Sequence, residues 1–88
     1  MPRRITVITR RRCELCAELL EHLAPYAATD RLIIEQRDVD GDAALLAAHA
    51  WRVPVVMEGD QELLWGRIEA HEIVAAFGPN PAATGSPG

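Results

Sequence analysis

The sequence predicts a small α/β domain of three layers, in which a mixed four-stranded sheet lies between helices. Apolar runs typical of strands alternate with segments that have the period of a helix. The only two cysteines form a Cys-x-x-Cys pair between the first apolar run and the first helical segment. Two short strands late in the chain are joined by a tight turn, as in a hairpin. The expected order of elements is therefore β-α-β-α-β-β-α.

The first half of the chain predicts a βαβ unit. Residues Ile5–Thr9 are apolar at nearly every position, which is typical of a central strand covered on both faces. After a polar turn at Arg10–Arg12, apolar residues recur at i, i+3, i+4 and i+7 on one helix face: Cys16, Leu19, Leu20 and Leu23. Pro25 is expected to kink or end this helix. The second strand, Leu32–Val39, should run parallel to the first through a right-handed crossover.

The second half predicts a short helix and a hairpin. Asp42 is a suitable cap for an alanine-rich helix at Ala43–Ala50, and Trp51–Pro54 then interrupts the helical pattern. Val55–Met57 and Glu62–Trp65 are short apolar runs on either side of a turn that contains glycine. These two strands should add antiparallel neighbours to the sheet.

A last helix and a tail complete the chain. Gly66 is expected to open the helix, and Gly78 with Pro79 should end it. Its apolar face would be formed by Ala70, Ile73, Val74 and Phe77. We expect one domain over residues 1–79 and a disordered tail over 80–88, which consists mostly of small residues and proline.

Composition excludes several classes of function. The 88 residues carry a net charge of -4, which argues against general nucleic-acid binding. No apolar run approaches the roughly 18 residues of a membrane span, and the amino terminus lacks the apolar stretch of a secretory signal. We therefore expect a cytoplasmic location. In that compartment a single cysteine pair is typical of catalysis or metal binding rather than of a permanent cross-link.

The spacing of the two cysteines favours reversible disulfide chemistry. Positions i and i+3 of a helix lie close to the separation that a disulfide needs, and the first turn can adjust. Cys13 would stand at the helix start, where free backbone N–H groups and the helix dipole favour a thiolate. Arg11 and Arg12 are expected to add to this effect. Cys16, one turn inside on the apolar face, would resolve the mixed disulfide that Cys13 forms. The alternatives are a disulfide kept for stability, a metal site, or an idle pair.

Val53–Pro54 is a second feature of interest. A proline is tolerated at the start of a strand because no ladder hydrogen bond is needed there. Alternatively, it is a cis-proline facing the cysteines, which leaves the backbone N–H and C=O of Val53 free to pair with an extended substrate.

With these elements, the chain resembles the thioredoxin-fold redox proteins, and most closely the small bacterial glutaredoxin-like branch. The resemblance covers roughly Ile5 to Phe77 and depends on the Cys-x-x-Cys pair and Val53–Pro54. It implies a thiol–disulfide oxidoreductase in which Cys13 attacks, Cys16 resolves and Val53 binds glutathione or a peptide backbone. The alternatives are a non-catalytic binding module of the same fold and a metal or iron–sulfur carrier.

The chain differs from typical glutaredoxins in two places. Glu14 and Leu15 replace the proline and the aromatic residue between the cysteines, and Gly66–Arg67 replaces a double glycine. We therefore expect glutathione to be a poor co-substrate, no bound cofactor, and a monomer that acts on a protein disulfide or a thiol reductant. The expected substrate surface is formed by Arg52, Val53, Pro54, Gly66 and Arg67.

The histidines and tryptophans have simpler explanations. His22, His49 and His71 lie on separate faces or helices, so solvated or capping roles are expected in place of a zinc site. Trp51 and Trp65 are expected in the core rather than along a substrate groove, since large aromatic side chains are mostly buried.

Overall fold

The structure is a computed structural model that describes residues 2–82. The elements in chain order are β1 (Arg3–Thr9), α1 (Glu14–Ala28), β2 (Leu32–Asp38), the single 3-10 turn η1 (Val39–Gly41), α2 (Ala43–His49), β3 (Val55–Glu58), β4 (Gln61–Trp65) and α3 (Ala70–Phe77). The predicted order of strands and helices is confirmed. Most of the predicted tail, positions 83–88, lies outside the described residues.

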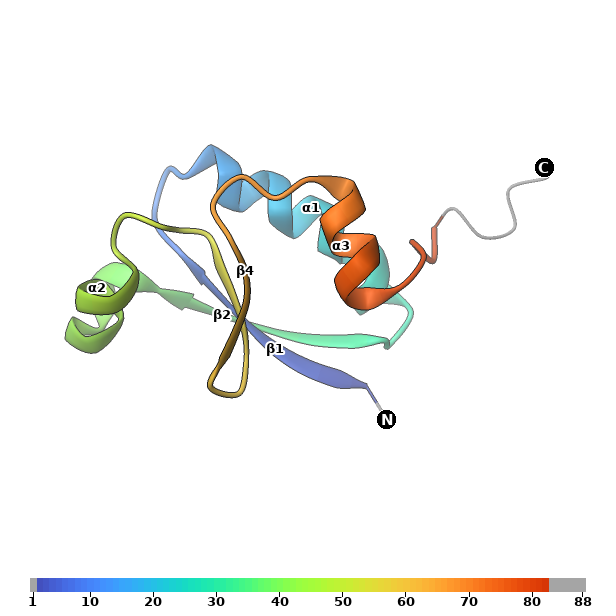
Figure 1. Ribbon diagram of the computed structural model, residues 1–88, viewed down its shortest axis with the longest axis horizontal. Helices are drawn as coiled ribbons and strands as arrows, with labels where there is room; N and C mark the ends of the chain where they lie inside the picture. Colours follow the sequence, from blue (N-terminus) through green and yellow to red (C-terminus); the bar gives the residue numbers. More distant parts are fainter. Residues whose placement is uncertain (1, 83–88) are drawn as a thin grey trace.

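The four strands form one mixed sheet in the order β2-β1-β3-β4. β1 and β2 are parallel, whereas β3 is antiparallel to both β1 and β4. The carboxyl ends of β1, β2 and β4 therefore meet the amino end of β3 at one end of the sheet. We call this the cysteine end, because the loop between β1 and α1 lies there (Figure 1).

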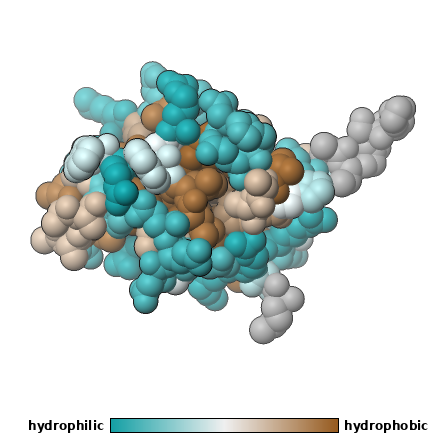
Figure 2. Space-filling view, in the orientation of Figure 1, coloured by the Kyte–Doolittle hydropathy of each residue, from teal (hydrophilic) through white to brown (hydrophobic). Residues whose placement is uncertain are grey.

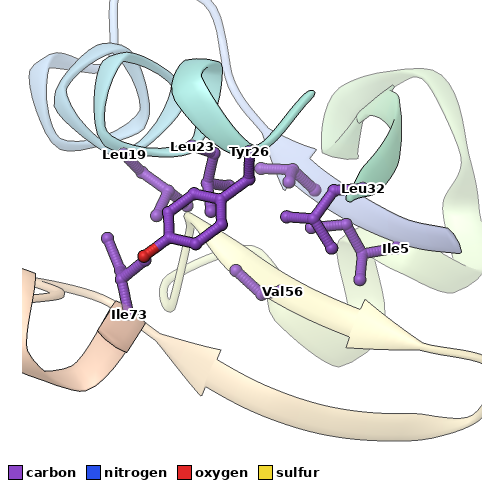
Figure 3. Close-up of a cluster of buried hydrophobic side chains, with 8 residues drawn as sticks. Ile5, Leu19, Leu23, Tyr26, Leu32, Val56 and Ile73 are labelled. Carbon is purple, nitrogen blue, oxygen red and sulfur yellow. The ribbon is translucent and has the colours of Figure 1, made fainter. Parts of the chain in front are cut away.

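Helices cover both faces of the sheet, as the three-layer prediction requires. Successive residues of a strand point to opposite faces, so Val7 and Val56 belong to one buried cluster whereas Ile8 and Val55 belong to another. The larger cluster is covered by α1 and α3, and Figure 3 shows its side chains converging between them and the sheet. Its buried members are Ile5, Val7, Leu19, Leu23, Tyr26, Leu32, Val56 and Ile73.

The smaller cluster lies under α2. It consists of Ile8, Val39 and Val55, with Leu45 of α2 packed against it. α2 has only seven residues, so it covers only the cysteine end of this face. The space-filling view shows one face of the molecule, on which tan and brown side chains gather at the α2 end and in the middle (Figure 2).

Pro25 is expected to kink or end the first helix, and the helix does not end there. α1 runs three residues further, to Ala28. Tyr26 explains this, because its side chain is only 1% exposed and its hydroxyl donates a 2.7 Å hydrogen bond to the carbonyl of Gly78. Burying an aromatic ring of this size more than offsets one lost helical hydrogen bond.

Other boundaries also differ from the prediction, most of them by one or two residues. Val39 ends the strand pattern but belongs to η1, because the Asp38 carboxylate accepts the N–H of Asp40 and turns the chain. Gly66 does not open the last helix. α3 begins four residues later, where Glu69 and Glu72 form a reciprocal capping box. None of the helices within residues 2–82 is long and apolar enough to cross a membrane.

Candidate functional site

A disulfide between Cys13 and Cys16 lies at the cysteine end of the sheet. Cys13 is the N-cap of α1, and its sulfur accepts the backbone N–H of Cys16 at 3.1 Å. Cys13 is partly exposed, whereas Cys16 is only 3% exposed, on the face that packs toward the sheet. The two sulfurs therefore differ in access, because only the first can meet a large partner.

The two arginines before Cys13 are free in the structure. Arg11 and Arg12 are both exposed, and within residues 2–82 neither guanidinium has a carboxylate or hydrogen-bond partner. Arg12 has a φ of 56°, a left-handed conformation that carries the chain from the turn into the helix. Their support of a Cys13 thiolate therefore stays a prediction, one that would depend on charge and on proximity in sequence alone.

An open hollow of about 530 Å³ lies beside the disulfide, between the first turns of α1 and the end of β2. The lining residues are Thr9, Arg10, Arg12, Cys13, Glu14, Cys16, Ala17, Leu20 and Gln36. None of the residues predicted for the substrate surface lines this hollow.

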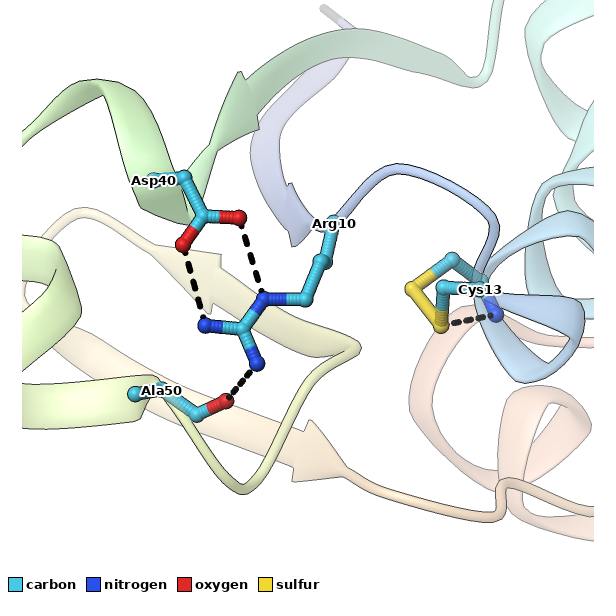
Figure 4. The surroundings of a disulfide bond; sticks show 5 residues. Arg10, Cys13, Asp40 and Ala50 are labelled. Carbon is cyan, nitrogen blue, oxygen red and sulfur yellow. Dashed lines mark hydrogen bonds and ion pairs between the residues drawn. A yellow bond between two sulfur atoms is a disulfide. The ribbon is translucent and has the colours of Figure 1, made fainter.

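Arg10 makes a contact that the sequence did not predict. Its Nε and Nη2 donate to both carboxylate oxygens of Asp40, at 3.1 and 3.0 Å, and its Nη1 donates to the carbonyl of Ala50 at 3.0 Å. Figure 4 shows the guanidinium between η1 and the end of α2, with the disulfide on its other side. The hydrogen bonds to Asp40 raise the pKa of Arg10, so it remains a cation. Arg10 thereby ties the cysteine loop to the loop that follows α2.

The loop at Val53–Pro54 lies at the same end of the sheet. Its peptide bond is cis, and Pro54 is buried. The N–H of Gly66 donates to the carbonyls of both Arg52 and Pro54, at 3.2 and 2.8 Å. In contrast, within the described part of the chain neither the N–H nor the C=O of Val53 has a hydrogen-bond partner. The structure thus brings four of the five predicted substrate residues together.

Arg52 and Arg67 differ in availability. The Arg52 guanidinium pairs with both oxygens of Glu62, at 2.9 and 3.0 Å, and lies 5.5 Å from the Trp65 ring centroid. It also lies 3.4 Å from Nδ1 of His49. Arg67 is exposed and has no such partner among the described residues. Arg52 therefore holds its own loop, and of these two arginines only Arg67 has a guanidinium without a partner among the described residues.

The expectations for the tryptophans and for one histidine are wrong. Trp51 is 86% exposed and Trp65 is 55% exposed. Both tryptophans therefore lie outside the core. His49 is only 8% exposed, because it packs beside Arg52 and near Glu62. Within residues 2–82, no three cysteine, histidine or acidic side chains lie close enough to hold a metal ion.

A thioredoxin-like fold with a Cys-x-x-Cys disulfide at the start of its first helix is typical of the thioredoxin-fold redox proteins. The family model described as Glutaredoxin-like domain (DUF836) matches residues 4–78. The chain therefore belongs to this family, and its Cys-x-x-Cys pair gives it redox capability.

Two solved structures are similar to the chain. One is the X-ray structure of protein XcR50 from X. campestris, with 32% identity and a TM-score of 0.66, covering 82% of this chain and 92% of that one. The other is the solution NMR structure of protein Ne2328 from Nitrosomonas europaea, with 28% identity and a TM-score of 0.72, covering 88% of this chain and 93% of that one. No curated protein matches the sequence. These neighbours support the fold and the family.

Proposed function

We propose that this protein is a thiol–disulfide oxidoreductase in which Cys13 attacks and Cys16 resolves. The observation that carries the proposal is the unequal access of the two sulfurs in one disulfide. Cys13 is partly exposed at the N-cap of α1, and Cys16 is buried one turn inside. The N–H of Cys16 that donates to the Cys13 sulfur would also stabilise a negative charge there.

The reaction transfers two electrons from the dithiol to a substrate disulfide. The Cys13 thiolate attacks one substrate sulfur, the substrate S–S bond breaks, and the other substrate sulfur leaves as a thiolate. Cys16 then loses its proton and attacks the Cys13 sulfur of the mixed disulfide. This step releases the second substrate thiol and forms the Cys13–Cys16 disulfide. An external thiol reductant restores the dithiol by the reverse exchange.

The substrate we propose is a protein disulfide rather than glutathione. The free N–H and C=O of Val53 suit an extended peptide backbone, as the family resemblance implies. Glutathione carries two carboxylates, and Arg10 and Arg52 are already paired with Asp40 and Glu62. Arg67 has no partner within residues 2–82 but stands where typical glutaredoxins have bare glycine backbone, and Glu14 beside the reactive sulfur would repel an acidic ligand. No resident cofactor enters this scheme. The proposed setting is a reducing compartment, the cytoplasm, and the proposed state is a monomer.

Reduction of insulin disulfides tests the proposal. Two electron sources should be compared in parallel, glutathione with glutathione reductase and a thioredoxin reductase system, each driven by NADPH. We expect turnover with the thioredoxin reductase system, slow turnover with glutathione, and none for Cys13→Ser. Cys16→Ser should accumulate a mixed disulfide through Cys13. If wild-type protein turns over with neither source, the chain is a non-catalytic module and the proposal is wrong.

Arg67 offers a separate test of glutathione use. If its free guanidinium replaced the missing glycine backbone as a carboxylate partner, a small glutathione mixed disulfide would be reduced efficiently and saturably. Arg67→Ala would then abolish that reaction. This pair of results would overturn the preference for protein substrates, whereas slow and unsaturated kinetics in both proteins would support it.

A further inference from the structure

Trp51 has no role in the fold or in the redox steps proposed above. Its side chain is 86% exposed, more than any other large apolar side chain that the structure describes. The other exposed large apolar residues within residues 2–82 are 39 to 55% exposed: Ile33, Leu46, Trp65 and Val74. An indole ring offers a large apolar area and a single N–H donor, and tryptophan is enriched where partners dock. A ring this open therefore provides binding area that the fold itself does not use.

The backbone on both sides of Trp51 is fixed. The carbonyl of Ala50 accepts from Arg10 at 3.0 Å, and the N–H of Arg52 donates to His49 at 2.9 Å. The Arg52 side chain is in turn held by the Glu62 carboxylate. The segment that presents the ring is thus ordered before any partner arrives, which reduces the entropy lost on binding.

The free backbone groups of Val53 lie two residues beyond Trp51. An extended chain advances about 3.3 Å per residue, so a segment paired with Val53 has side chains within reach of a large ring two residues away. Only a polypeptide provides both features, a backbone N–H and C=O for Val53 and a side chain for the ring. A small disulfide is too short to reach both.

We propose that Trp51 is the specificity-determining contact for protein substrates. The occupant is an extended polypeptide segment that carries the disulfide and has an aliphatic or aromatic side chain two residues from its cysteine. This inference rests on the proposed function, since the segment is the oxidoreductase substrate. The surface is defined by the Trp51 ring and the Val53 backbone, beside the cysteine loop that Arg10 ties to it.

The test uses two synthetic peptides with one internal disulfide each. They are identical except that the positions two residues before and after the first cysteine are leucine in one and serine in the other. Reduced protein is mixed with excess peptide, quenched with acid, alkylated, and its thiols are counted by mass spectrometry. For wild-type protein we expect the leucine peptide to react about tenfold faster, equivalent to roughly 1.4 kcal/mol.

Substitutions at Trp51 should remove this preference without affecting small disulfides. In Trp51→Ala both peptides should react at the rate of the serine peptide, and bis(2-hydroxyethyl) disulfide should react within twofold of wild type. Trp51→Phe should keep most of the preference, because it keeps a ring. Val74→Ala, which truncates an exposed apolar side chain on α3, is the matched control and should change neither rate.

The outcomes separate this inference from the proposed function. If wild-type protein reacts with none of the three disulfides, the oxidoreductase proposal is wrong. If it reacts but does not distinguish the peptides, or if Trp51→Ala keeps the distinction, the role of Trp51 is wrong and the redox proposal stands. Sedimentation provides one more check, since a wild-type dimer that dissociates on Trp51→Ala would make this surface a contact between two copies and overturn the inference.

Discussion

Arg3 and Arg10 make the same set of contacts at the two ends of β1. Each donates Nε and Nη2 to both oxygens of one carboxylate, and each donates Nη1 to a backbone carbonyl near the end of a helix. For Arg3 the partners are Glu58 and Ala76, at 2.8 to 2.9 Å. For Arg10 they are Asp40 and Ala50, at 3.0 to 3.1 Å.

The surroundings of these two arginines differ. Arg3 joins β1, β3 and α3, which already pack around the larger buried cluster, and its guanidinium lies 4.9 Å from the Phe77 ring centroid. Arg10 joins segments that meet only over the smaller cluster of Ile8, Val39 and Val55. The same contact therefore reinforces packing at one end and sets the position of loops at the other. We infer that Arg3 serves stability and Arg10 serves the redox site.

Removing the Arg10 contact should have the largest effect on activity. Arg10→Ala frees the loop that carries Val53 relative to Cys13, and small displacements of a reacting group are costly in rate. We expect kcat/KM for insulin reduction to fall about tenfold, with a small change in melting temperature. Asp40→Asn is the companion variant and should move the rate in the same direction. A normal rate in both variants would show that the two loops keep their positions without this contact.

Removing the Arg3 contact should mainly lower the melting temperature and have little effect on the rate. Arg3→Ala should lower the melting temperature by a few degrees and leave the rate of insulin reduction within twofold of wild type.

The pKa of Glu58 lies below its ordinary value of 4.5, chiefly because of its hydrogen bond to Arg3. A carboxyl group whose pKa is lower in the folded protein than in the unfolded chain stabilises the fold at pH values above its pKa in the unfolded chain. This contribution is lost as the pH falls through the pKa of the group in the folded protein. The difference in melting temperature between variant and wild type should therefore be full at pH 7 and shrink below about pH 4. A difference that is constant from pH 7 to pH 3 would contradict the ion-pair explanation.

The free arginines should matter less than the paired Arg10. Replacing Arg11 and Arg12 by glutamate reverses the charge beside Cys13, so its thiolate should form at higher pH and react more slowly at neutral pH. The helix dipole contributes about 0.3–1 kcal/mol on its own, so part of the thiolate preference should remain. Absorbance of the thiolate during a pH titration measures this. An unchanged titration would assign the whole effect to the helix.

The smallest effect is expected from the carboxyl terminus. Residues 83–88 are mostly small or proline and lack apolar content to repay ordering, so their deletion should leave the melting temperature within error. A deletion from Asn80 onward also removes Pro81, which is buried. Comparing the melting temperatures of the two deletions distinguishes the contribution of residues 83–88 from that of residues 80–82. A loss of several degrees in the shorter deletion would mean that the tail docks on the domain.

Patterns local in sequence predicted most of this fold. The apolar runs and the helical spacing of Leu19 and Leu23 defined the elements, and the Cys-x-x-Cys pair located the redox centre. Local rules failed where tertiary packing was stronger, as when buried Tyr26 carried α1 past Pro25. They failed again for Gly66, whose hydrogen bonds to the loop before β3 keep it out of the last helix.

The supporting contacts of the site depend on pairs that are distant in sequence. Arg10 and Asp40 are 30 positions apart, and nothing in either segment marks the other as its partner. The exposure of Trp51 likewise could not be predicted from residue type, since large aromatic side chains are mostly buried. Residue chemistry thus located the cysteine pair, whereas the contacts that hold the surrounding loops required the three-dimensional arrangement.

The most direct test of the redox account compares the reactivity of the two thiols. Fully reduced protein should be pulsed with iodoacetamide at pH 7, quenched with acid, and digested, so that labelling of each cysteine is read by mass spectrometry. Cys13 is partly exposed at the helix start and Cys16 is buried, so we expect Cys13 to be labelled first and Cys16 to be protected. Faster labelling of Cys16 than of Cys13 would contradict the assignment of attacking and resolving thiols.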